Sequence, residues 1–135
     1  MTHSTAAAST GRLLIAAAGI LLPYLARLPG GFAWLEQYTA AGVGGFLFTT
    51  ALDGIALGWM LVWTSLIRQP RWWLLPCGLG FGYLAWAHGS LDLSADAQAA
   101  IAVVFIPIHA LVPITVGGVV GLAMDRLTRR TAAEA

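Results

Sequence analysis

Four ionisable side chains lie within or beside the long apolar stretches of this sequence: Arg27, Asp53, His88 and His109. A carboxylate inside an apolar membrane segment costs at least ~2.5 kcal/mol on insertion scales, so it normally faces other helices, a partner side chain or water. Histidine has an unperturbed pKa of about 6.5, so modest shifts change its charge at physiological pH. These residues are therefore the ones whose chemistry matters most.

Three interpretations of these residues are open. In the first, Asp53 pairs with Arg27, with a histidine or with hydroxyl groups, and the pair only fixes how the helices pack. In the second, Asp53 and His109 form a titrating pair that handles protons or ions. Pro113 favours this, because it has no N–H and leaves the backbone oxygen of His109 free. In the third, His88 and His109 bind a haem or a transition metal.

Other chemistry has less support. The sequence contains no HExxH or CxxC spacing, so no cofactor or metal is predicted outside that third interpretation. Ser65 and Ser90 do not lie in a nucleophile motif, and we expect the chain not to be an enzyme. The single cysteine, Cys77, excludes an internal disulfide and is expected to be a small buried residue.

Composition places the chain in a membrane. Of its 135 residues, 59 % are hydrophobic and 10 % are charged, and its mean hydropathy is +0.78. Soluble domains have a lower apolar content, roughly 45–50 %. The basic residues are scattered arginines rather than a patch, so nucleic-acid binding is not expected. The sequence predicts one all-α integral-membrane domain over residues 1–135, with lipids around it.

The apolar runs predict four transmembrane helices, at about 13–28, 42–67, 72–91 and 95–124. Residues 1–11 and 126–135 are expected to be flexible tails. Ser94 is the predicted N-cap of the last helix. A cleaved signal peptide over residues 1–26 is the alternative for the first run, although Tyr24 stands where the cleavage site needs a small residue.

The arginines predict an orientation. If the N-terminus is cytoplasmic, six arginines lie on the cytoplasmic side and only Arg27 lies on the other side. We therefore expect a multi-pass protein of a bacterial-type inner membrane with both termini in the cytoplasm. The acids Glu36, Asp92 and Asp96 then face outward. The six cytoplasmic arginines are Arg12, Arg68, Arg71, Arg126, Arg129 and Arg130.

The same arginines give a depth for the ionisable residues. Counting inward from them at 1.5 Å per helical residue places Asp53, His88 and His109 at about 22, 26 and 26 Å. These depths lie in the outer part of a hydrocarbon core of about 30 Å. Three helices are thus expected to bring an ionisable group into one layer, with Arg27 at a similar level on the first helix.

Glycine pairs four residues apart occur on three of the predicted helices. Such pairs let a neighbouring backbone approach closely, which predicts tight packing within the chain or between chains. Four helices enclose little space, so transport would need a homo-oligomer or a larger complex. The pairs are Gly54/Gly58, Gly78/Gly82 and Gly117/Gly121.

These observations favour a non-catalytic accessory or assembly subunit of a larger membrane complex, docked through its glycine-rich helix faces. The alternative is a homo-oligomeric proton-coupled transporter or channel that uses Asp53 and His109. A second alternative is a haem- or metal-binding redox subunit that uses His88 and His109.

Overall fold

The computed structural model describes residues 2–95 and 98–134, and all regular structure in these residues is helical. Three stretches are long and apolar enough to cross a membrane, namely Ala8–Gly30, Gly42–Leu66 and Ala99–Ala133. The prediction of an all-α membrane protein is therefore confirmed. The helices are α1 (Thr2–Leu25), α2 (Phe32–Thr39), α3 (Gly42–Leu66), α4 (Leu74–Ser90) and α5 (Ala99–Glu134), with 3-10 turns at Leu28–Gly30 and Pro70–Trp73.

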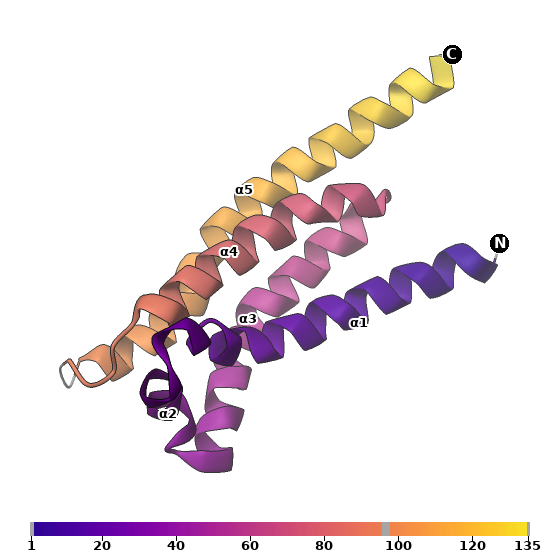
Figure 1. Cartoon of the computed structure of the whole chain (residues 1–135). Helices are drawn as coiled ribbons and strands as arrows, with labels where there is room; N and C mark the ends of the chain where they lie inside the picture. Colours follow the sequence, from indigo (N-terminus) through magenta and orange to yellow (C-terminus); the bar gives the residue numbers. More distant parts are fainter. Residues whose placement is uncertain (1, 96–97, 135) are drawn as a thin grey trace.

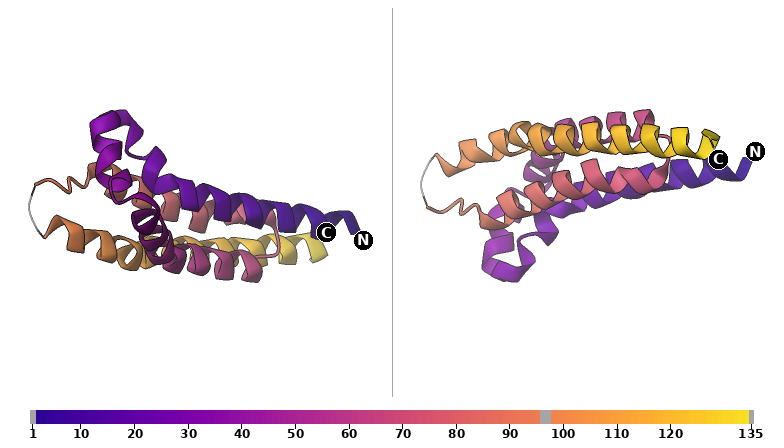
Figure 2. Two further views of the ribbon diagram at one scale, coloured as in Figure 1. Left: turned by 90° about the horizontal axis from the view of Figure 1, so that it is seen from below. Right: turned by 90° about the horizontal axis from the view of Figure 1, so that it is seen from above.

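The four long helices run side by side (Figure 1). Figure 2 shows both ends of the chain at the same end of this bundle. At the opposite end, α2 and the beginning of α3 project to one side (Figure 2). This projecting part contacts the end of α1 and holds several of the polar residues described below.

Several helix boundaries differ from those that the sequence predicts. Helix α1 begins at Thr2, so residues 2–11 are helical rather than a tail, in keeping with their many alanines, the best helix formers. Helix α5 continues to Glu134, which makes the expected C-terminal tail helical as well. The predicted span at 72–91 is divided into the turn Pro70–Trp73 and the 17-residue helix α4. The short helix α2 was not predicted.

The loop before α5 corrects the predicted N-cap. Helix α5 begins at Ala99, four residues later than expected, so Ser94 is not at its start. Instead, the backbone N–H and the hydroxyl of Ser94 donate to Asp92 Oδ1 over 2.9 and 2.7 Å. The carboxylate of Asp92 thereby closes a turn of its own, a local bond that competes with helix formation. Asp96 lies outside the described residues.

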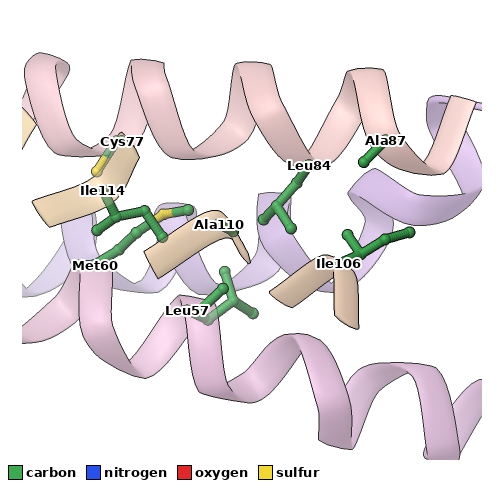
Figure 3. Packing of buried hydrophobic residues seen from close by; sticks show 9 residues of the cluster. Leu57, Met60, Cys77, Leu84, Ala87, Ile106, Ala110 and Ile114 are labelled. Carbon is green, nitrogen blue, oxygen red and sulfur yellow. The ribbon is translucent and has the colours of Figure 1, made fainter. Parts of the chain in front are cut away.

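The apolar core lies where α3, α4 and α5 meet. Met60, Ala110 and Ile114 are completely buried there (Figure 3). Gly80 of α4 faces this core, and a Cβ on it would lie 2.5 Å from Met60 and 2.6 Å from Ile114. Cys77 belongs to the same cluster, as predicted. The other members of the cluster are Ala56, Leu57, Leu84, Ala87 and Ile106.

The three glycine pairs have different surroundings. Gly117 and Gly121 of α5 lie against the chain that enters α4: a Cβ would be 2.5 Å from the Leu75 carbonyl oxygen and 2.9 Å from that of Trp72. This pair is used for packing within the chain. For the pairs Gly54/Gly58 on α3 and Gly78/Gly82 on α4, no atom of the residues described above lies within 4 Å of such a Cβ, and all four glycines are exposed.

Arginine-bearing segments meet at the end of the bundle where the termini lie. Arg12 of α1 donates to the Thr64 carbonyl over 3.2 Å. Asp125 of α5 is completely buried and accepts the backbone N–H groups of Arg68 and Gln69 over 3.4 and 3.0 Å. Its Oδ2 also pairs with Arg129 at 3.0 Å. Asp125 thus fastens the turn after α3 to α5.

Candidate functional site

The opposite end of the bundle contains a buried chain of three side chains. His88 of α4 lies between two partners, with Nδ1 2.8 Å from the Tyr38 hydroxyl and Nε2 3.2 Å from Asp53 Oδ1. His88 is completely buried and Asp53 is 2 % exposed. When Nε2–H donates to Asp53, Nδ1 accepts the Tyr38 hydroxyl proton in the neutral ring and donates to the Tyr38 oxygen in the imidazolium. The three groups form a continuous hydrogen-bonded path from α2 to the middle of α3.

Arg27 lies beside this chain and is completely buried. It follows the end of α1 and donates from Nε to the Trp34 carbonyl and from Nη1 to the carbonyls of His88 and Leu91, each over 2.8 Å. Its guanidinium also stacks over the Tyr38 ring, 4.1 Å from the ring centroid. A planar guanidinium with five donors satisfies several acceptors at once. Arg27 therefore joins α1 to α2 and to the end of α4.

Gln37 of α2 extends the network to the loop after α4. It accepts from Arg27 Nη2 and from the Leu93 N–H, and it donates to Asp92 Oδ1 over 2.9 Å. The pKa of Asp92 is lowered most by the hydrogen bond from the Ser94 hydroxyl and next by the one from the Ser94 backbone N–H. Asp92 is therefore a stable carboxylate at the edge of the network. We call Arg27, Gln37, Tyr38, Asp53, His88 and Asp92 the polar cluster.

Burial determines the protonation state of Tyr38. Desolvation raises the pKa of its phenol to about 12, although the adjacent Arg27 charge acts in the other direction. The phenol thus keeps its proton over the physiological range and serves as a neutral donor or acceptor. The edges of its ring also face aromatic neighbours, with centroids 6.3 Å from Tyr24 and 5.7 Å from His88.

The structure brings together three of the four residues that the sequence singled out. Asp53 contacts His88, and Arg27 contacts the backbone of His88. His109 does not join them, because its side chain is exposed on the outer face of α5 and its Nδ1 contacts the Phe105 carbonyl over 2.9 Å. Depth along the membrane axis is therefore insufficient to predict which histidine pairs with Asp53, because the side chain must also point to the correct side of its helix.

The same placement bears on metal or haem binding. His88 uses both ring nitrogens on Tyr38 and Asp53, whereas His109 faces outward on another helix, so one chain does not assemble the pair as axial ligands. Within residues 2–95 and 98–134, no group of three His, Cys, Asp or Glu side chains is arranged to hold a metal ion.

Some buried oxygens near Asp53 have no hydrogen-bond partner among the described residues. They are Asp53 Oδ2, Thr50 Oγ1 and Tyr24 Oη. The Tyr24 hydroxyl lies close to the Thr49 side chain and within electrostatic reach of Asp53, which places it near this part of α3, although its contact with Thr49 does not have the geometry of a hydrogen bond. Buried polar groups without partners are uncommon and costly, so these oxygens mark a local feature that needs an explanation.

Tyr38 of the polar cluster lines two pockets. One, of about 510 Å³, is almost entirely apolar and lies between α1, α2 and the start of α3, where Tyr24, Tyr38 and Phe46 form part of its wall. The other, of about 240 Å³, is lined by Gln37, Tyr38 and Thr49 together with residues of α5. Tyr38 therefore separates an apolar pocket on the α1 side from a more polar one on the α5 side.

Sequence reasoning missed Tyr38, Gln37 and Asp125 as partners of the charged residues. Tyr38 and Gln37 belong to the unpredicted helix α2. The available signal was the pattern Trp34, Gln37, Tyr38, whose spacings of three and four put these side chains on one face of a short helix. For Asp125, the only signal was an acid placed four residues before Arg129.

Comparison with known proteins adds no further assignment, because no family model, curated protein or solved structure matches this chain.

Proposed function

We propose that this protein is an accessory or assembly subunit of a larger membrane complex, and that it docks through the outward glycine pairs of α3 and α4. The observation that carries the proposal concerns the described residues: none of their atoms lies within 4 Å of a Cβ built on Gly54, Gly58, Gly78 or Gly82, whereas Gly117 and Gly121 pack closely against the chain that enters α4. Lipid gives no hydrophobic drive for helix association, so close backbone approach at small residues is the main source of attraction.

The surroundings of these pairs support docking. Large exposed apolar side chains lie beside them, including Ile55 and Val62 on α3 and Leu79 and Trp86 on α4. A partner helix can therefore rest its backbone on the glycines and its side chains on these neighbours. We further propose that α4 crosses a bacterial-type inner membrane together with the other three long helices, with both termini in the cytoplasm. The grouping of six arginines near one end supports this orientation.

The experiment compares glycine variants by native mass spectrometry of protein released gently from its own membrane. Gly58→Ile and Gly82→Ile should keep the fold, because space is open there, and should lose the partner or second copy. Gly44→Ile is the matched control, since Gly44 is equally open at the start of α3 but outside the pairs. Partners retained by both paired-glycine variants would refute docking through these faces.

A second candidate function is proton-coupled transport in an oligomer, with His88 rather than His109 as the partner of Asp53. The continuous path Tyr38–His88–Asp53 favours it, because a histidine that receives one hydrogen bond and donates another can transfer a proton. Wild-type protein reconstituted in liposomes should then pass protons, and Asp53→Asn should stop the flux. Liposomes that stay silent with wild type would count against transport.

A further inference from the structure

We propose that the interface between α1 and α3 contains a binding site for one Na⁺ ion, with Asp53 Oδ2 as its charged ligand. This inference does not depend on docking or transport, because equilibrium binding of an ion requires neither.

The first step is the placement of Asp53 and Thr50 in this interface. Phe46, Thr50, Asp53 and Leu57 are spaced by four, three and four residues, so they lie on one face of α3. The two ends of this face contact α1: the Phe46 ring stacks on Tyr24 with centroids 5.6 Å apart, and Leu57 fills the space where Gly19 has no Cβ. Thr50 and Asp53 lie between these contacts and therefore face α1.

The second step is the set of oxygens at this position. Asp53 Oδ2, Thr50 Oγ1 and Tyr24 Oη are buried, and none of them has a hydrogen-bond partner within the described part of the chain. Pro23, one turn after Gly19 in α1, has no N–H, so the Gly19 carbonyl does not receive the usual intrahelical bond. The carboxylate and the two hydroxyls are hard oxygen ligands of the kind that bind Na⁺, and carbonyls freed from helical bonding are used in the same way in interrupted membrane helices.

The third step is charge. Arg27 is linked through Gln37 to Asp92, so its charge is already matched inside the polar cluster. Within the part of the chain that the structure describes, Asp53 has one hydrogen-bond contact, between Oδ1 and His88 Nε2, and Oδ2 has none. A buried carboxylate needs a counter-charge. A monovalent cation at Oδ2 would neutralise the single negative charge of the carboxylate, whereas a divalent cation would leave a net positive charge.

The pocket of about 510 Å³ lies beside this interface, between α1, α2 and the start of α3, and Tyr24 is part of its wall. Thr49 lies one helical turn before Asp53 and is itself 7 % exposed.

The test is the thermal unfolding of the purified full-length chain in detergent, in NaCl and in choline chloride at equal ionic strength. Choline is the control cation, because oxygen ligands in such a site cannot coordinate it as they coordinate Na⁺. Above the dissociation constant, each tenfold rise in Na⁺ should raise the wild-type Tm by roughly 5 °C. Asp53→Asn and Thr50→Val should lose most of this Na⁺-dependent shift. Ser65→Ala, an exposed change at the far end of α3, should keep it in full.

Two results would overturn the site. One is a wild-type Tm that is the same in Na⁺ and choline. The other is a Na⁺-dependent shift that persists in Thr50→Val and Asp53→Asn, since the ion would then bind elsewhere. If Asp53→Asn does not fold, Thr50→Val and radioactive ²²Na⁺ binding decide: about one ion per wild-type chain supports the site, and no bound ²²Na⁺ refutes it.

Discussion

Nε2 of His88 lies 3.2 Å from Oδ1 of Asp53, although the two residues are 35 positions apart in the chain. Both side chains are almost completely buried, so each provides the hydrogen-bond partner that water would otherwise provide for the other. The hydroxyl of Tyr38 on the far side of the ring fixes its orientation. This relationship joins α3, α4 and α2, and the stability of that end of the bundle should depend on it.

His88→Leu should therefore destabilise the protein strongly. The substitution leaves the Asp53 carboxylate buried without its hydrogen-bond donor, and breaking a buried pair in this way costs about 3–5 kcal/mol. Unfolding in detergent followed by circular dichroism measures the loss. His109→Leu is the control, because that side chain is exposed and the change should stay within about 0.5 kcal/mol. Equal losses in the two variants would contradict this role of His88.

Arg27→Lys should be far from conservative. Arg27 donates to three backbone carbonyls and to Gln37, whereas an ammonium group cannot span these directions. Each hydrogen bond to a charged group is worth about 1.5–3 kcal/mol, so we expect a loss of at least ~3 kcal/mol in unfolding free energy. The matched change Arg126→Lys, at an exposed arginine, should have almost no effect. A fully stable Arg27→Lys variant would disprove the arrangement of donors.

Gly117→Ala and Gly82→Ala should have opposite effects on stability. A Cβ at Gly117 would meet the Leu75 carbonyl oxygen at 2.5 Å, so the helices must separate, at a cost of about 1–3 kcal/mol. At Gly82 the space is open, and alanine should gain up to ~1 kcal/mol through its higher helix propensity. The Tm values of the two purified variants provide the comparison, and a more stable Gly117→Ala would show that the contact is loose.

Asp125→Asn should loosen the turn between α3 and α4. Asp125 accepts two backbone N–H groups and is completely buried, so removing its charge should cost about 1–3 kcal/mol. Arg129→Gln tests whether the ion pair matters by itself. Because Arg129 is 39 % exposed, that change should cost at most ~1 kcal/mol. Hydrogen exchange at the Arg68 and Gln69 amides should rise in Asp125→Asn and stay low in Arg129→Gln.

The lowered pKa of Asp92 predicts that the stability of the folded chain depends on pH. Its folded pKa lies below the ordinary value of 3.8, because Ser94 donates to the ionised form. A depressed pKa stabilises the folded chain above that ordinary value, and the contribution is lost as the pH falls through the folded pKa. Ser94→Ala should move the pKa back towards 3.8, which NMR titration of the Asp92 carboxyl carbon detects. An unchanged titration in the variant would show that Ser94 is not the cause.

The sequence by itself determined the class of this protein and the residues that matter. Long apolar runs and the scarcity of charge can only be satisfied by helices in lipid, and the bounds of α3 were predicted within one residue. Burial of Asp53, His88 and Arg27 follows from the cost of leaving such groups in lipid. The arginine pattern likewise indicated which helix ends belong together.

Tertiary structure decided which of these residues meet. His88 and His109 have the same predicted depth, but the packing of α4 turns His88 towards Asp53, whereas the packing of α5 leaves His109 exposed. The same applies to glycines: Gly117 and Gly82 belong to identical spacings, and only packing fills one and leaves the other open. Helix periodicity defines faces within a helix, whereas the partner of each face depends on contacts between residues distant in the chain.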